Sequence, residues 1–510
     1  MITKRLFTAV ICIFMLAGTL LFAVSCGDST NPLDNNDGNV NINENDFGDS
    51  ISDTPAEEGR GSVADGVPSD LKFNGQIFNI LSRNETIDEL VYGIEMGVGE
   101  ENGDIVNDAL YRRNKSIEER FDITINDIKM PGIWGAEGTF NNAIKKSVKA
   151  GDNAYDLIAG YAYFITPLAA DGNFTNWRNI SYADPDAPWW SSDLADKMTL
   201  DGKLYFMSGD LSLSMTAQTM CMFFNKRLQQ NYNVEDIYQT VLDGKWTYDR
   251  FYNVYKDIYT DVNGNGEKDK EDIYGLATLY GGNFCDQMFV SQNQPMTQKG
   301  GDGYPYLTLN SQKTTKITEN MMALLFDHPG VYSVPEASES ETLGMFKNGQ
   351  ALFTMGYMYN TQFFRDMKDD FGILPYPKFD EAQDSYMGLI QDAYSLFCVP
   401  ATSGRTDFVG AVTEALAAES YRYVTPAYYE TAMKIKYSRD DMTSRMLDII
   451  RDGARFDFAF VNSNSIENII HIFRELSNKK STDFVSLYEK YEPRYQKALD
   501  KLIDKYKGLD

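Results

Sequence analysis

Short apolar runs alternate with amphipathic segments over residues 75–160, and this alternation limits the fold more than any other feature. The first amphipathic segment places Leu110, Ile117 and Phe121 on one helical face and its charges elsewhere. Strands that alternate with helices are typical of a parallel sheet covered by helices, and ligands bind such sheets beyond the carboxyl ends of the strands. The sequence therefore predicts an α/β fold. The expected strands are 75–81, 123–125 and 155–160, and the expected helices are 107–121 and 141–149.

The remainder of the chain repeats this alternation less regularly. Because 510 residues exceed what one ordinary hydrophobic core supports, we expect two or more lobes. Pro493 predicts a kink or a break in the last helix. Further strands are expected at 219–224, 351–355 and 396–399, and further helices at 249–259, 407–419, 442–451 and 481–506.

Charge and residue types exclude several classes of function. The 47 Lys and Arg against 74 Asp and Glu give a net charge of −27, which argues against a nucleic-acid partner and against adsorption to anionic lipid. His328 and His471 are the only histidines, so a histidine-rich metal centre is excluded. No G-x-S-x-G, P-loop or dinucleotide-binding motif is present. The many carboxylates leave a glycosidase acid pair open.

The N-terminus has the organisation of an export signal. Lys4 and Arg5 precede the apolar residues 6–24, and small residues lead to Cys26. Residues 1–25 resemble a bacterial lipoprotein signal peptide, although Ala23 departs from the commoner leucine, and the resemblance implies that Cys26 is acylated. An ordinary signal peptide or an uncleaved anchor is the alternative. Residues 26–70 are rich in Asn, Asp, Gly, Ser and Glu, a composition that predicts a disordered tether.

Several stretches in a specific order resemble one family. Residues 223–228 (FFNKRL) and 243–247 (DGKWT) look like the extracellular solute-binding proteins of ABC importers, the class (family 1) that contains maltodextrin-binding proteins. Residues 107–121, 155–160 with Trp177, 346–353 and 371–377 agree. The resemblance implies a type II periplasmic-binding-protein fold, in which two lobes joined by hinge crossings close on a ligand like a flytrap. It implies an N-lobe of 71–210 and 335–390, a C-lobe of 211–334 and 391–510, and crossings near 211–218, 327–334 and 390–394.

The same resemblance implies a function. A monomer attached by lipid to the extracellular face of the cell membrane would capture a small solute and deliver it to an ABC transporter permease, without being an enzyme. Aromatic residues make up 13% of the chain, which favours a carbohydrate or oligosaccharide as the solute. The alternatives are a lipid-anchored surface glycoside hydrolase and a surface adhesin. Turnover of an oligosaccharide would identify the hydrolase, and binding to macromolecules would identify the adhesin.

Candidate ligand contacts follow from the strand-end rule together with the resemblance. Aromatic faces can stack on sugars, and carboxylates can accept hydrogen bonds from hydroxyls. For each position the alternative is an aromatic residue of the rim or core, or a hinge turn. The predicted ligand-binding residues are Glu85, Tyr161, Tyr163, Asp210, Tyr357, Tyr359, Asp392 and Tyr394.

One loop has the spacing of a calcium site. Residues 261–272 carry oxygen side chains at loop positions 1, 3, 5, 9 and 12 and a glycine at position 6, the pattern that wraps one loop around Ca²⁺. Asp272 stands where EF-hands have Glu and resembles the loops of dockerin modules, and Lys268 argues against a paired loop. The alternative is a polar turn without an ion. The predicted ligands of a structural Ca²⁺ are Asp261, Asn263, Asn265, Glu267, Asp269 and Asp272.

Overall fold

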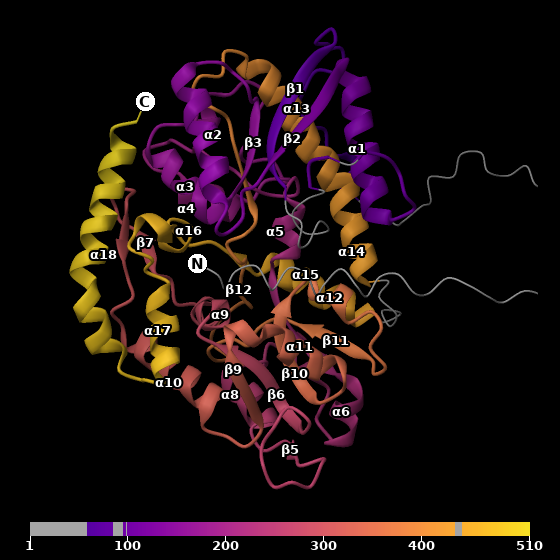
Figure 1. Ribbon diagram of the computed structural model, residues 1–510, viewed down its shortest axis with the longest axis vertical. Helices are drawn as coiled ribbons and strands as arrows, with labels where there is room; N and C mark the ends of the chain where they lie inside the picture. Colours follow the sequence, from indigo (N-terminus) through magenta and orange to yellow (C-terminus); the bar gives the residue numbers. More distant parts are fainter. Residues whose placement is uncertain (1–58, 85–94, 98, 434–440, 510) are drawn as a thin grey trace, which may run out of the picture. The chain divides into compact units, whose positions relative to one another are not determined.

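The computed structural model describes residues 59–84, 95–97, 99–433 and 441–509 (Figure 1). All of them belong to one unit of the chain, Pro55–Asp510. This unit is built around two main β-sheets with helices packed on them. The predicted signal peptide, Cys26 and most of the predicted tether lie outside the described residues.

The first sheet has the strand order β13-β3-β1-β2. β1 pairs in parallel with β2 and β3, whereas β13 runs antiparallel to β3. The carboxyl ends of β1, β2 and β3 therefore meet at the edge where β13 begins. The predicted strand–helix alternation over residues 75–160 is confirmed. The strands are β1 (Gln76–Arg83), β2 (Ile123–Met130), β3 (Leu157–Tyr161) and β13 (Ser395–Cys398), and the helices between them are α1 (Ile105–Phe121) and α2 (Glu137–Ala150).

Helix α1 shows how the sequence builds this layer. Asp104 caps it by accepting hydrogen bonds from the backbone N–H groups of Val106 and Asn107, and Asp122 ends it with a left-handed φ of 52°. Leu110 and Phe121 are buried, as the periodicity predicts. α13 (Thr406–Glu419) packs against α1. It carries an unbroken run of buried residues because it has neighbours on all sides.

The second sheet has the order β11-β4-β10-β6-β5, and β9 also pairs with β6. β6 is parallel to β9 and β10, while β4 is antiparallel to β10. The carboxyl ends of β6, β9 and β10 therefore share one edge. The strands are β4 (Met220–Asn225), β5 (Tyr259–Thr260), β6 (Ile273–Tyr280), β9 (Val331–Pro335), β10 (Ala351–Tyr357) and β11 (Phe371–Leu374). The helices along this part are α6 (Lys226–Asn231), α7 (Ile237–Leu242), α8 (Tyr248–Tyr255), α9 (Asn283–Ser291), α10 (Gln312–Phe326), α11 (Glu339–Lys347) and α12 (Asn360–Phe363).

The strand pairing differs from the predicted division of the chain. β10 and β11, from the 335–390 segment assigned to the N-lobe, join the second sheet with β4. β13, from the segment assigned to the C-lobe, joins the first sheet. The crossing predicted near 327–334 is wrong, because β9 adds to β6 within the second sheet. The full boundaries of the lobes stay a prediction.

Two segments carry the chain from one sheet to the other. The first leaves the bridge between Met207 and Phe397 and enters β4, and the second leaves β11 and enters β13. A bridge between Thr219 and Ile390 holds the two passages together. Both coincide with predicted crossings, near 211–218 and 390–394. Their short elements are α5 (Leu213–Ala217) and β12 (Gly388–Leu389), which pairs with β14 (Ala454–Arg455). Helix α4 (Ser192–Met198) precedes the first passage.

The C-terminal helices contact the elements of both sheets. α18 packs on α3 (Ala162–Ala170), which follows β3, and on α10, which precedes β9 (Figure 1). Pro493 lies inside α18 without breaking it, so the predicted break is wrong. Among the described residues, no helix is both long and apolar enough to cross a membrane. The remaining elements are α14 (Thr425–Met433), α15 (Asp441–Asp452), α16 (Phe458–Val461), α17 (His471–Lys479), α18 (Phe484–Lys507) and the hairpin of β7 (Thr297–Lys299) and β8 (Pro305–Leu307).

Candidate functional site

The second crossing segment, residues 388–394, is attached to the carboxyl end of β3. The N–H of Ala162 donates to the carbonyl of Tyr394 at 3.0 Å. The hydroxyl of Tyr161 donates to Oδ1 of Asp392 at 3.3 Å, and the Gln391 amide donates to the same oxygen at 2.9 Å. Strand end and crossing therefore place a tyrosine and a partly buried carboxylate side by side, as the strand-end rule predicts.

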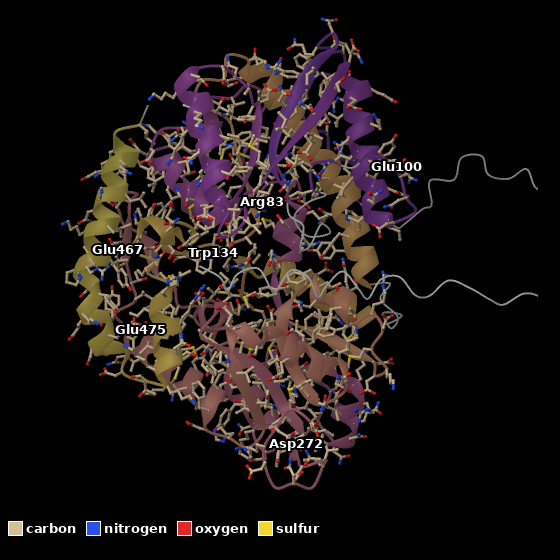
Figure 2. The ribbon with its side chains drawn as sticks, in the orientation of Figure 1. Arg83, Glu100, Trp134, Asp272, Glu467 and Glu475 are labelled. Carbon is tan, nitrogen blue, oxygen red and sulfur yellow. The ribbon has the colours of Figure 1, made fainter. Side chains whose placement is uncertain are left out.

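Four aromatic side chains gather at this edge of the first sheet, and we call them the aromatic platform: Trp134, Tyr161, Tyr163 and Phe164. The Trp134 ring lies 5.5 Å from that of Tyr163 and 5.3 Å from that of Phe164. Phe164 meets Tyr161 edge-on at 5.0 Å. Tyr161 and Tyr163 are buried in a small apolar cluster separate from the main core. Trp134, which Figure 2 labels, is 64% exposed. The platform therefore offers one indole ring to solvent on a buried aromatic base.

Charged side chains gather beside the edge of the second sheet, and we call them the charged cluster: Asp286, Glu336, Asp392 and Arg474. Asp286 lies in α9 after β6, Glu336 follows β9, and Arg474 comes from α17. Arg474 donates from Nε and Nη2 to Oδ2 of Asp286 at 2.9 and 2.5 Å, and from Nη2 to Asn283 Oδ1 at 2.5 Å. Asp286 is fully buried and Glu336 is exposed. The cluster therefore extends from the interior to the surface.

Electrostatic coupling joins the members of the charged cluster. Burial raises the pKa of Asp286 to about 7; Arg474 opposes this rise, and Asp392 and Glu336 add to it. Burial likewise raises the pKa of Asp392, with Arg474 and the Tyr161 hydroxyl opposing. Burial lowers the pKa of Arg474, but the three carboxylates together hold it above its usual value. One cation is thus shared among three carboxyl groups.

A hydrogen bond connects the aromatic platform with the segment that carries Arg474. The Tyr163 hydroxyl donates to Oδ1 of Asn468, and the Asn464 amide donates to the Tyr163 carbonyl at 3.3 Å. Both asparagines lie shortly before α17. Platform and charged cluster therefore form one site, with stacking surface and hydrogen-bonding groups from both sheets and from the C-terminal segment.

Two of the other predicted residues lie at the end of β10. Tyr357 is buried, and its hydroxyl accepts a hydrogen bond from the Asn283 amide at 3.4 Å. The ring of Tyr359 stacks on that of Tyr357 at 5.2 Å with an interplanar angle of 8°. Asn283 also contacts Arg474, so Tyr357 is directly joined to the surroundings of the charged cluster.

The remaining predicted ligand residues lie elsewhere or are not described. The Tyr394 ring is 2% exposed and meets Phe456 edge-on at 5.8 Å. Asp210 donates its N–H to the Trp189 carbonyl, and burial raises the pKa of its carboxyl group against a hydrogen bond from Thr425. Tyr394 meets this edge of the first sheet through its carbonyl, which accepts from the N–H of Ala162. Glu85 lies outside the described residues.

Four residues of this site are absent from the sequence-based prediction: Trp134, Asp286, Glu336 and Arg474. Trp134 follows β2 by a few residues, so the strand-end rule applied to β2 as well as to β1 and β3 would have found it. Asp286 and Arg474 are 188 residues apart and carry no local motif. Only the tertiary fold brings them together.

The predicted calcium loop connects β5 to β6 at the far end of the second sheet, where Figure 2 labels Asp272. Asp261 accepts hydrogen bonds from the N–H groups of Gly264 and Gly266 at 2.7 and 2.9 Å. Asp272 is fully buried and accepts from the Tyr259 hydroxyl at 2.9 Å. The first and last carboxylates of the loop therefore organise its backbone.

The amides in the middle of the loop present nitrogen rather than oxygen to Asp269. Nδ2 of Asn263 and of Asn265 donate to Oδ2 of Asp269 at 3.2 and 2.9 Å. The oxygen of Asn265 accepts instead from the Glu267 N–H at 2.7 Å. Over the described part of the chain, no three His, Cys, Asp or Glu side chains are arranged to surround a metal ion. A calcium ion fits this loop only if the two amides turn their oxygens toward it.

A separate hollow of about 360 Å³ lies beside α1 and β2 and contains none of the predicted site residues. Its lining is polar and includes Tyr111, Lys115, Asp127 and Lys129.

Comparison with known families agrees with this architecture. Residues 114–421 match the family model described as bacterial extracellular solute-binding protein. The match covers more than half of the chain, and the chain therefore belongs to this family. The predicted membership and the predicted α/β fold are confirmed.

Solved structures of solute-binding proteins share the fold at low sequence identity. An ABC substrate-binding protein from Listeria monocytogenes, in complex with cycloalternan, is 13% identical with a TM-score of 0.50 over 86% of this chain and 100% of the other. A cyclo/maltodextrin-binding protein complexed with maltotetraose is 12% identical, with a TM-score of 0.52 over 86% and 97%. UgpB from Mycobacterium tuberculosis, in complex with glycerophosphocholine, is 14% identical, with a TM-score of 0.52 over 80% and 100%. No curated protein matches the chain in sequence.

Proposed function

We propose that this solute-binding protein captures a carbohydrate or oligosaccharide at the aromatic platform and the charged cluster and delivers it to an ABC transporter permease. A pyranose ring has an apolar C–H face that stacks on indole, and hydroxyl groups that donate to carboxylates. The observation that carries the proposal is that Trp134, whose ring packs against Tyr163 and Phe164, is 64% exposed. An exposed indole on a packed aromatic base offers a flat face on which a ligand ring can stack.

The ligands bound in similar structures support a carbohydrate as the solute. Cycloalternan and maltotetraose are oligosaccharides. The glycerophosphocholine of UgpB carries a phosphate, which favours cationic partners. In this chain Arg474 is engaged by Asp286 and Asn283, so the charged cluster suits hydroxyl groups better than phosphate. The comparisons give the alternative of a glycoside hydrolase no support, because the family is one of binding proteins.

Attachment to the membrane is part of the same proposal. An acyl group on Cys26, followed by the polar tether of residues 26–70, would hold a monomeric binding protein at the extracellular face of the cell membrane. The support is the sequence of the signal and of the tether. The family name, with its word extracellular, agrees with export.

We propose Ca²⁺ as a structural ion for the loop at residues 261–272. The support is the spacing of its oxygen side chains. Asp261 and Asp272 accept hydrogen bonds from within or beside the loop, and the Asn263 and Asn265 amides would have to rotate before their oxygens could bind the ion. The ion would stabilise the β5–β6 connection, at a distance from the sugar site.

A thermal-shift screen of neutral oligosaccharides tests the proposed function. A ligand that binds only the folded state raises the melting temperature with concentration. The control variant is Tyr306→Ala, which removes an exposed aromatic ring outside the site. Tyr306 lies on β8 and is 48% exposed. We expect a rise for the wild type and for the control. Release of shorter sugars during incubation would instead identify a hydrolase.

A further inference from the structure

The charged cluster holds more negative than positive charge. Arg474 is its only cation, against the carboxyl groups of Asp286, Asp392 and Glu336, as far as the described residues show. Nε and Nη2 of Arg474 are both directed to Asp286 and Asn283. Among the described residues, Asp392 and Glu336 therefore have no bonded cation, although both interact with Arg474 through space.

The nearby Arg83 does not supply the missing charge. Its guanidinium lies 5.2 Å from the centre of the Tyr161 ring, and Nη2 donates to Ser395 Oγ at 3.0 Å. Ser395 in turn donates to the buried carboxylate of Glu95 at 2.6 Å. Arg83 thus belongs to a second buried network with a carboxylate of its own, and it is not among the groups that shift the pKa of Asp392.

Unused hydrogen-bonding capacity accompanies the excess charge. Oδ1 of Asp286 is buried and has no hydrogen-bond partner among the described residues. Both hydrogen bonds to the Asp392 carboxylate reach Oδ1, so Oδ2 is open to a further donor. A buried carboxylate oxygen without a partner is costly, even where Arg474 is bonded to the other oxygen. A cationic donor from the ligand would satisfy Oδ2 of Asp392.

The cation that fits is an ammonium group rather than a metal ion. The three carboxylates are spread from the interior to the surface and do not surround a common point. Among the described residues, no three His, Cys, Asp or Glu side chains are placed to hold a metal ion. An ammonium group needs no such shell, since its three N–H donors can serve separate acceptors. Beside the aromatic platform, the carrier of that group would be a sugar ring.

We propose that the preferred ligand is a saccharide that carries a basic amino group, with its ring on Trp134 and its ammonium group between Asp392 and Glu336. This inference rests on the proposed capture of a carbohydrate and names its chemical class. It also predicts rejection of acidic sugars, because a carboxylate or phosphate placed here would face the excess negative charge.

Isothermal titration with a glucosamine oligomer and an N-acetylglucosamine oligomer of equal length tests the inference. The two differ chiefly in the charge of the nitrogen. We expect the amine to bind about tenfold more tightly, the size of one modest charge interaction. Glu336→Gln, at an exposed position, should reduce the ratio of the two dissociation constants several-fold, because it removes one of the three carboxylates that attract the amine. Glu119→Gln, an exposed carboxylate on α1, controls for general attraction of cations to a chain of charge −27.

The outcomes separate the inference from the proposed function. Equal affinity for the two oligomers, tighter binding of an oligogalacturonate, or an equal drop in Glu336→Gln and Glu119→Gln would overturn the inference and leave sugar capture intact. Spermidine binding as tightly as the amino sugar would overturn the saccharide part. If no saccharide of any charge binds, the proposed function itself fails. Asp286→Asn provides a second variant, expected to reduce the same ratio.

Discussion

Replacement of Trp134 by Ala should weaken ligand binding without weakening the fold. A large aromatic side chain has up to about 250 Å² of surface, so an exposed fraction of 64% corresponds to roughly 160 Å². A sugar ring on one face covers about half of this, ~80 Å². At about 25 cal/mol per Å², that is about 2 kcal/mol, or roughly a thirtyfold rise in Kd.

Titration calorimetry measures the change in Kd, and intrinsic fluorescence shows where the ligand lies. All tryptophans of the chain except Trp134 are buried, so acrylamide should quench Trp134 selectively, and bound ligand should protect it. The melting temperature of Trp134→Ala without ligand should match the wild type, because exposed substitutions have little effect on stability. An unchanged Kd in Trp134→Ala, or quenching that ligand does not reduce, would refute the role of the platform. The buried tryptophans are Trp177, Trp189, Trp190 and Trp246.

Three further outcomes follow from the structure. Burial raises the pKa of Glu414 from 4.5 to about 7, although hydrogen bonds from the Trp190 and Trp189 indoles oppose the rise. Between these two values the folded state therefore keeps a proton that the unfolded state has lost. Stability should therefore fall between about pH 5 and pH 7.5, by up to about 3 kcal/mol from this group, and thermal melts of Glu414→Gln should show a flatter pH profile. Ca²⁺ titration should give heat with the wild type and none with Asp261→Ala; identical traces would refute the proposed calcium site. Cys26→Ser should move the protein from the membrane fraction to the medium, and retention in the membrane would favour an uncleaved anchor.

The first sheet could be predicted from the sequence because its signals are local. Strands β1, β2 and β3 alternate with α1 and α2 along the chain, and each helix carries its own apolar face. Tyr161 and Tyr163 could be selected from the same pattern, since the strand-end rule needs only the end of β3. The fold places both in the aromatic platform.

The second sheet and the charged cluster could not be predicted in the same way. β10 pairs with β4, more than a hundred residues earlier in the chain, and no periodicity reports which distant strand lies alongside. The pairing of Asp286 with Arg474 could not be predicted either, because in the sequence each residue is only a charged residue in a predicted or possible helix. Pro493 shows the reverse: a strong local signal for a break is overruled where α18 is held by packing on α3, α10 and α17.

The crossing segment joins the geometry of the two sheets to the chemistry of the site. Tyr163 donates its N–H to the Asp392 carbonyl at 3.4 Å, so the backbone at Asp392 is fixed to the first sheet. The Asp392 side chain interacts with Arg474, which is bonded to α9 behind the second sheet. A change in the angle between the sheets therefore moves Arg474 relative to Asp392 and to the platform. Because the ligand would contact Trp134 beside the first sheet and Glu336 beside the second, it would stabilise the arrangement in which the platform and the charged cluster face one another.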